Sequence, residues 1–190
     1  ALQARYDQEV AFTDAAVGEL VETLRELGLY EDTLILVTSD HGEAFLEHGQ
    51  LGHAFAPHEE LIHVPLVVRQ PARSSAFAGR VDRPVGLIDV MPTLIEVAGL
   101  EPEPGAQGES FAPLLRGEEM ADRVIFSDTY DAFSARSRTH KLIWFEDGHR
   151  EFYDLVEDPG EQRSMADPCQ GACRELAQVL RPFRQGMRGS

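Results

Sequence analysis

The sequence predicts an α/β protein, because helical and strand patterns alternate along its first hundred residues. Apolar residues recur at alternating spacings of four and three between Tyr6 and Leu27, which is typical of an amphipathic helix. Two short runs rich in β-branched and aliphatic residues follow, at residues 33–37 and 64–69, and both predict strands. Helix, strand, loop and strand is the order expected of a sheet covered by helices.

The elements are separated by residues that favour turns. Gly28 is expected to end the first helix, because glycine commonly terminates helices. The small and polar residues 70–83 predict a surface loop. Asp89 can N-cap a helix that carries Pro92 in its first turn and ends at Gly99. Two prolines and two glycines in residues 101–108 predict an exposed connection.

The last seventy residues have a different pattern. Residues 124–126, 141–145 and 151–155 predict three strands, and Asp147-Gly148 predicts a hairpin turn between the last two. Strands so close in sequence pair more easily antiparallel than parallel. An amphipathic helix over residues 174–183 is expected to close the chain.

The first predicted strand ends in Thr38-Ser39-Asp40-His41-Gly42-Glu43, which places a carboxylate next to an imidazole. Open α/β sheets bind ligands at the carboxyl ends of their strands. Asp40 and His41 are therefore candidate ligands of a divalent metal. The alternative is that Asp40 only caps a turn and that His41 is an ordinary surface or core histidine.

Histidines are concentrated in the loop that follows. Five of the seven histidines of the chain lie between residues 41 and 63. Clustered histidines bind metals, bind anions when protonated, or transfer protons. The loop between the two strands is therefore predicted to carry function.

Several segments, in this order, resemble the sulfatases of the alkaline phosphatase superfamily. The resemblance rests on Thr-Ser-Asp-His-Gly-Glu (38–43), Glu-His-Gly (47–49), Gly-His (52–53), Glu-Glu (59–60), His-Val-Pro-Leu-Val-Val (63–68), Asp-Val-Met-Pro-Thr (89–93), Gln-Gly-Glu-Ser-Phe-Ala-Pro-Leu-Leu-Arg-Gly (107–117), His-Lys-Leu-Ile (140–143), Glu-Phe-Tyr-Asp-Leu (151–155) and Glu-Asp-Pro (157–159). It covers nearly the whole chain.

The resemblance implies the C-terminal portion of a sulfatase. Residues 1–120 would form the rear part of an alkaline-phosphatase-like α/β/α sandwich, and residues 121–190 a small C-terminal antiparallel sheet with a helix. A full sulfatase begins with an Asp-Asp strand and a Cys-x-Pro-x-Arg or Ser-x-Pro-x-Arg segment that supplies the nucleophile, and neither is present here. We therefore expect a fragment without a nucleophile, inactive alone.

The resemblance also implies roles for individual residues. Asp40 would ligate the metal, and His41 would ligate it or contact the nucleophile. His53 lies where many relatives carry lysine, so it would bind a sulfate oxygen or protonate the leaving group. For His48, apart from the resemblance, we expect support of a neighbouring ligand or tethering of the loop and not a direct role in the site. His63 is expected to lie at the strand entry, packed against Glu59 or Glu60.

The cofactor implied by the resemblance is one divalent ion, with calcium first. Imidazole ligation would shift the preference toward manganese or zinc. The complete enzyme would hydrolyse sulfuric esters. Alternatives are a phosphate or phosphonate ester hydrolase, a phosphoethanolamine transferase, or a truncated, non-catalytic binding module.

The charge limits the partners. A net charge of −16 argues against nucleic acid and anionic membranes as partners. The small sulfate or phosphate ester that the resemblance implies as substrate is also an anion, so a metal and local cations would have to reverse the potential at the site. The sequence contains no membrane-spanning apolar run and no leader, although the N-terminal part implied by the resemblance could carry either. Cys169 and Cys173 could form a local bridge. Localisation, redox compartment and oligomeric state are left open.

Overall fold

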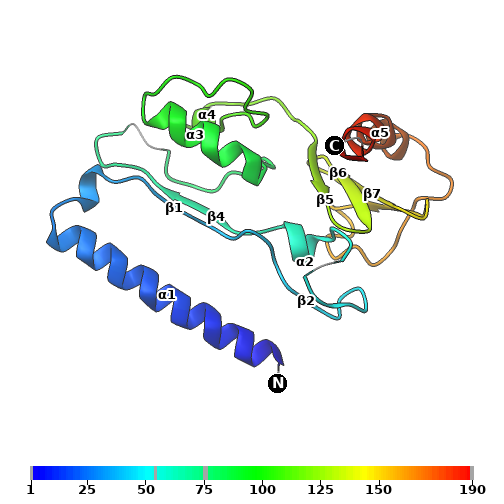
Figure 1. Cartoon of the computed structure of the whole chain (residues 1–190), viewed down its shortest axis with the longest axis horizontal. Coiled ribbons are helices and arrows are strands. Elements are labelled where there is room, and N and C mark those ends of the chain that lie inside the picture. The colour runs from blue at the N-terminus through cyan, green and yellow to red at the C-terminus, as the bar shows by residue number, and fades with distance from the viewer. Residues whose placement is uncertain (1, 54, 75–76, 189–190) are drawn as a thin grey trace. The chain divides into compact units, whose positions relative to one another are not determined.

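The computed structural model describes residues 2–53, 55–74 and 77–188. The chain divides into two compact units, one of residues 1–39 and 65–76, the other of residues 40–64 and 77–190 (Figure 1). Each unit is described by itself. The domain boundary at residue 120 stays a prediction.

The first unit contains a long helix and a two-stranded antiparallel ladder. Helix α1 (Leu2–Glu26) is followed by the short 3-10 helix η1 (Tyr30–Asp32), and strand β1 (Ile35–Thr38) pairs with β4 (Leu66–Arg69). Gly28 ends the helix as expected: its φ is 68°, and the next N–H donates to the Leu24 carbonyl at 2.9 Å. No described residue of α1 is buried. The pattern of strands predicted at residues 33–37 and 64–69 is confirmed.

The second unit begins with the histidine-rich loop, which has local structure of its own. Strands β2 (Ala44–Phe45) and β3 (Leu51–Gly52) form a small hairpin, and helix α2 (Glu59–Ile62) precedes β4. The pairing of Ala44 with Gly52 places the residues that flank the hairpin, Glu43 and His53, side by side.

Asp89 joins three segments of the second unit. It ends the 3-10 helix η2 (Leu87–Asp89) and precedes α3 (Val90–Val97), and α4 (Ala112–Leu115) follows a loop. The N-cap prediction is wrong in one respect: the Asp89 side chain makes no capping hydrogen bond to α3. Its buried carboxylate instead accepts the N–H groups of Gly86 and Glu109 at 2.7 and 2.9 Å and pairs with Arg123. Asp89 therefore connects Gly86, the loop that contains Glu109, and Arg123, and does not cap α3 through its side chain.

The C-terminal sheet has four antiparallel strands in the order β5-β6-β7-β8. These are Ile125–Asp128, Ala132–Arg136, His140–Phe145 and Arg150–Asp154. The sequence predicts three of them and misses β6, whose Ala-Phe-Ser-Ala-Arg carries little strand signal of its own. The predicted hairpin turn is present, with Gly148 at a φ of 94°.

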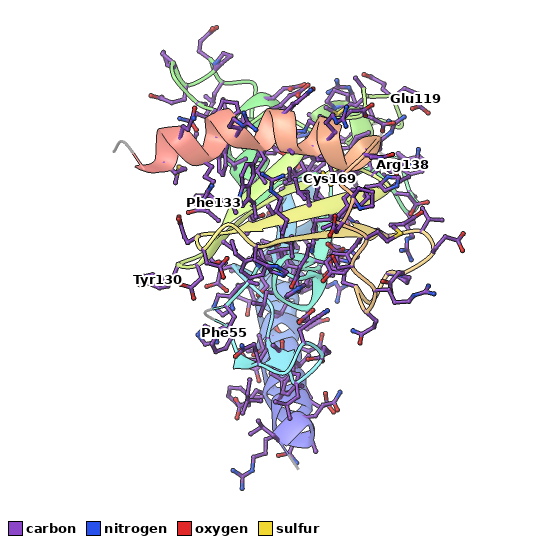
Figure 2. All side chains as sticks on the ribbon, turned by 90° about the vertical axis from the view of Figure 1, so that its right-hand side faces the viewer. Phe55, Glu119, Tyr130, Phe133, Arg138 and Cys169 are labelled. Carbon is purple, nitrogen blue, oxygen red and sulfur yellow. A yellow bond between two sulfur atoms is a disulfide. The ribbon has the colours of Figure 1, made fainter. Side chains whose placement is uncertain are left out.

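Helix α5 (Ala172–Arg188) packs on one face of this sheet, as Figure 1 shows. Phe133, labelled in Figure 2, lies in the core between them with Leu142, Trp144 and Leu180. A disulfide joins Cys169 to Cys173 beside this core. Because side chains alternate along a strand, β7 directs Lys141 and Ile143 to the opposite face. The predicted antiparallel sheet with a helix is confirmed.

None of the helices in the described part of the chain is both long enough and apolar enough to span a membrane.

Shortening Leu180 to alanine is expected to destabilise the second unit by about 2–4 kcal/mol, because this side chain is fully buried between α5 and the sheet. Val179 is 41% exposed on the same helix, so Val179→Ala is the matched control and should cost well under half as much. Urea unfolding of both variants measures the difference. Equal losses would contradict the packing described above.

Candidate functional site

Asp40 and His41 lie together at the start of the second unit, and both are exposed. Their side chains are 87% and 46% exposed. The Asp40 Oδ1 accepts the His41 backbone N–H at 3.0 Å, and its Oδ2 lies 3.7 Å from His41 Nε2. The His41 Nδ1 donates to the Gly42 carbonyl at 2.8 Å. Because Nδ1 faces this carbonyl, Nε2 is the ring nitrogen through which His41 could ligate a metal.

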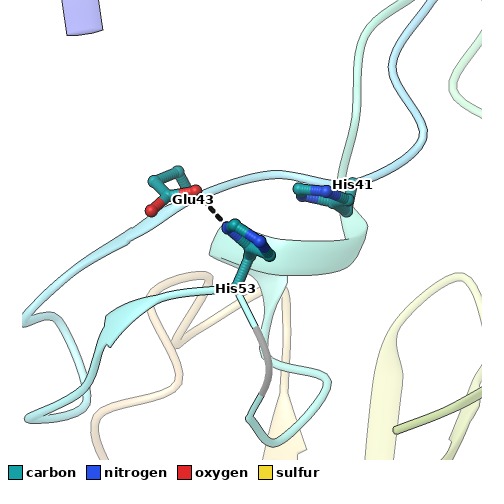
Figure 3. Close-up of side chains that lie close together, drawn as sticks. All are labelled: His41, Glu43 and His53. Carbon is teal, nitrogen blue, oxygen red and sulfur yellow. Dashed lines mark hydrogen bonds and ion pairs between the residues drawn. The ribbon is translucent and has the colours of Figure 1, made fainter.

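Two further residues bring ligand atoms close to His41. One ligand atom each of His41, Glu43 and His53 lie within 4.8 Å of one another (Figure 3). The two imidazole rings stack with centroids 4.4 Å apart, and His53 Nδ1 is 2.8 Å from Glu43 Oε2. The β2–β3 hairpin produces this geometry, because it pairs the segments on which Glu43 and His53 lie.

The structure therefore brings together His41 and His53, two of the residues singled out from the sequence. It adds Glu43, which sequence reasoning did not assign. The signal for Glu43 was its place at the end of the Asp-His-Gly-Glu motif, opposite His53 once the hairpin forms. Asp40 is not in this group of three, although it touches His41. The individual roles of these residues stay predictions.

Gly42 holds the motif against α2. Its N–H donates to the Leu61 carbonyl at 2.8 Å. A Cβ at this position would lie 2.0 Å from the Glu60 carbonyl oxygen, so only glycine permits the approach. The position of α2 therefore sets the position of the residues on either side of Gly42.

A second pair of histidines has a different environment. His48 and His58 stack with centroids 3.8 Å apart and planes 4° apart. His48 Nδ1 faces Glu60 Oε1 at 2.7 Å, its Nε2 faces the Glu161 carbonyl at 2.9 Å, and His58 Nε2 faces Glu151 at 2.8 Å. Since a carbonyl and a carboxylate both accept, His48 must donate from both nitrogens as an imidazolium.

These contacts connect the second histidine pair to α2, to β8 and to the turn at Glu161. His48, His58 and Glu60 also place ligand atoms within 4.8 Å of one another. In this structure the His48 ring is engaged at both nitrogens, by Glu60 and by the Glu161 carbonyl, so its contacts fasten the loop. The predicted tethering role of His48 is confirmed, and so is the predicted contact of His63, which lies 3.4 Å from Glu59.

The pKa of His48 is raised above its ordinary value. Burial lowers this pKa, but the hydrogen bonds to Glu60 and to the Glu161 carbonyl, with the negative charge of Glu60, outweigh burial. The charged form is therefore favoured in the folded protein.

Beneath this loop lies a buried ion cluster, defined here as Lys141, Glu59, Glu161 and Arg136. Lys141 Nζ lies 3.0 Å from Glu59 Oε1 and 2.6 Å from Glu161 Oε1. Arg136 donates to both Glu59 oxygens at 3.1 and 3.2 Å. Burial raises the pKa of Glu59, but the charges of Lys141 and Arg136 and their hydrogen bonds lower it overall. Each carboxylate therefore has an ion-pair partner in the cluster.

Replacing His48 by glutamine is expected to cost about 1–2 kcal/mol of stability in mildly acidic solution, because the charged hydrogen bonds are lost. A group whose folded pKa is raised stabilises below its unfolded pKa, about 6.5, and this contribution disappears as the pH rises through the folded value. Urea unfolding from pH 5.5 to 9 measures the effect. A difference from wild type that grows toward alkaline pH would contradict the imidazolium.

The comparisons with known proteins show the family and the fold of the chain. The sulfatase family model matches residues 2–100, more than half of the chain. Arylsulfatase K of Danio rerio is 31% identical over 195 residues, which cover 95% of this chain and 36% of the relative. Human arylsulfatase K is 29% identical over 182 residues, covering 87% and 33%. The chain thus spans about a third of the length of these curated relatives.

Two solved structures match over 95% of this chain. One, solved in complex with its substrate D-glucosamine-2-N,6-O-disulfate, is 26% identical, with a TM-score of 0.74 over 40% of its own length. The other, a phosphonate monoester hydrolase of Agrobacterium radiobacter, is 27% identical, with a TM-score of 0.72 over 39%. These matches confirm the predicted part of an alkaline-phosphatase-like α/β/α sandwich followed by a small antiparallel sheet with a helix. The chain belongs to the sulfatase family.

Proposed function

We propose that this protein acts in the metal-dependent hydrolysis of sulfuric esters. The observation that carries the proposal is the His41, Glu43 and His53 group, directly after the strand-end Asp40, in a chain of the sulfatase family. Its relatives include arylsulfatases, and one solved relative binds a sulfated sugar. A small sulfated sugar or aryl sulfate is therefore the proposed substrate.

The roles we propose follow from the contacts. Asp40 and His41 ligate the metal, His41 through Nε2, whose lone pair is left by the Nδ1 hydrogen bond to Gly42. When bound, the metal offsets negative charge on the ester oxygens. Glu43 accepts from His53 Nδ1 and so orients the ring. When the ring is protonated, the Nε2–H donates to a sulfate oxygen or protonates the leaving oxygen.

The donors present bear on the identity of the metal. Sulfatases bind a divalent metal, and the described residues offer two imidazoles and two carboxylates for one. Calcium prefers six to eight oxygen ligands, whereas imidazole suits manganese and zinc. The resemblance places calcium first, and the imidazoles support manganese or zinc as rivals.

We infer that the nucleophile is not among these 190 residues. The sequence holds no Cys-x-Pro-x-Arg or Ser-x-Pro-x-Arg segment. Cys169 and Cys173 are joined in a disulfide, so neither offers a thiol. A phosphonate or phosphate ester remains the alternative substrate, because solved phosphonate monoester hydrolases are similarly close to this chain.

Replacing His41 by glutamine is expected to weaken metal binding by at least about tenfold, because a ligand is lost. Calorimetric titration with calcium, manganese and zinc separately also ranks the three metals. His149, a histidine 59% exposed on the β7–β8 hairpin, supplies the control His149→Gln, which should bind as wild type does. A loss with His53→Gln as large as with His41→Gln would make His53 a ligand. Absence of binding by wild type would contradict the metal site.

The 190 residues alone are expected to show no turnover of an aryl sulfate, because they carry half of the proposed site. An assay with p-nitrophenyl sulfate and a phenylphosphonate ester, with and without added metal, tests this. Turnover of either ester above the uncatalysed rate would contradict the inference. Reading the open reading frame upstream of Ala1 for an Asp-Asp strand and a Cys/Ser-x-Pro-x-Arg segment tests the same inference independently.

A further inference from the structure

Glu161 has an uncommon combination of properties. It is 1% exposed, and its φ of 55° lies in the left-handed region that residues with a Cβ seldom adopt. A tight turn fixes this backbone: the Glu161 N–H donates to the Asp158 carbonyl at 3.0 Å, and the Asp158 carboxylate accepts the N–H groups of Gln162 and Arg163. A disfavoured conformation persists where surrounding contacts hold it.

Those contacts reach the histidine-rich loop at two points. The Glu161 carbonyl accepts from His48 Nε2 at 2.9 Å, in the turn of the β2–β3 hairpin. Its carboxylate accepts the Glu59 N–H at 2.7 Å, at the first residue of α2, through Oε2. The other oxygen, Oε1, pairs with Lys141. One residue thus binds both the hairpin and α2 from about a hundred positions downstream.

Both attachments lead to the candidate metal group. The hairpin carries Glu43 at one end and His53 at the other. Within helix α2, the Leu61 carbonyl accepts the Gly42 N–H and so fixes the residue next to His41. The segments that carry all three members of the group are therefore anchored on Glu161.

We propose that Glu161 is a positioning residue, which sets the geometry of His41, Glu43 and His53 by holding the β2–β3 hairpin and α2 in place. The effect on metal affinity rests on the function proposed above. The effect on the geometry of the loop does not.

The matched experiment compares two buried carboxylates. Glu161→Gln removes a charge that supports the loop, whereas Asp89→Asn makes the same chemical change at a site that contacts Gly86, Glu109 and Arg123 instead. Amide hydrogen exchange, followed by NMR under native conditions, reports each hydrogen bond separately. Urea unfolding gives the global loss of stability in each variant.

In Glu161→Gln, the Gly42 and His63 amides are expected to exchange about tenfold or more faster than the amides of the β5–β6 ladder. In Asp89→Asn, the Gly86 and Glu109 amides should accelerate, and the Gly42 amide should follow only the global change. Metal affinity should fall by about tenfold in Glu161→Gln and stay near wild type in Asp89→Asn.

A charge-balanced variant supplies the rescue. In Glu161→Gln with Lys141→Met, the cluster keeps Arg136 and Glu59, and the glutamine Oε1 can again accept the Glu59 N–H without a cation beside its amide. Protection of the Gly42 amide should recover in part, whatever the change in global stability. If Glu161→Gln alone does not fold, the same exchange measurements are made on this double variant.

Two outcomes overturn the proposal. One is exchange in Glu161→Gln that rises equally at all amides, since Glu161 would then only stabilise the unit. The other is a Gly42 amide that stays protected while the Glu59 N–H contact is lost. If wild type takes up no metal, the proposed function fails, and the exchange comparison still decides the role of Glu161.

Discussion

The buried ion cluster is the constraint on which the candidate site depends. Lys141, the one lysine in the sequence, is fully buried on the sheet face opposite α5, where it pairs with Glu59 and Glu161. Two charges removed from water must be matched closely, and loss of one partner typically costs about 3–5 kcal/mol. The four-stranded sheet therefore has two kinds of face. The face toward α5 is apolar, whereas the opposite face carries the ion cluster together with the buried residues Ala132, Ile143 and Tyr153.

The residues that could bind a metal or an ester are distinct from the residues that hold them in position. The side chains offered to a metal or an ester are largely exposed, with Asp40 and His53 more than half accessible. Exposed side chains hold a geometry poorly by themselves, because solvent competes for their hydrogen bonds. Their positions follow from buried neighbours instead: the hairpin, α2 and the close approach of Gly42 to the Glu60 carbonyl. The C-terminal sheet thus belongs to the site, although no side chain of the His41, Glu43 and His53 group comes from it.

The two stacked histidine pairs show how partners determine what a residue does. His41 and His53 are exposed, and each places Nδ1 on a local acceptor, the Gly42 carbonyl and the Glu43 carboxylate respectively. His48 is more buried, with acceptors at both nitrogens that raise its pKa and fasten the loop. In the sequence these residues are simply neighbours in a histidine-rich segment. The contacts of the rings distinguish them: His41 and His53 belong to the candidate site, and His48 holds the loop that carries this site.

Much of the fold and part of the site could be predicted from local sequence. The apolar spacing of α1, the glycine that ends it, the β-branched strands and the Asp147-Gly148 hairpin depend on neighbouring residues, and so does the exposure of Asp40 and His41 after a strand. Strand β6 could not be predicted, because Ala132–Arg136 becomes a strand only between two partners. Glu43 comes close to His53 only because the β2–β3 hairpin pairs their segments. Glu161 contacts α2 only because its turn, far downstream in the sequence, packs against that helix. Local propensity depends on neighbouring residues, whereas the contacts of Glu161 join residues more than a hundred positions apart, so the tertiary structure alone decided them.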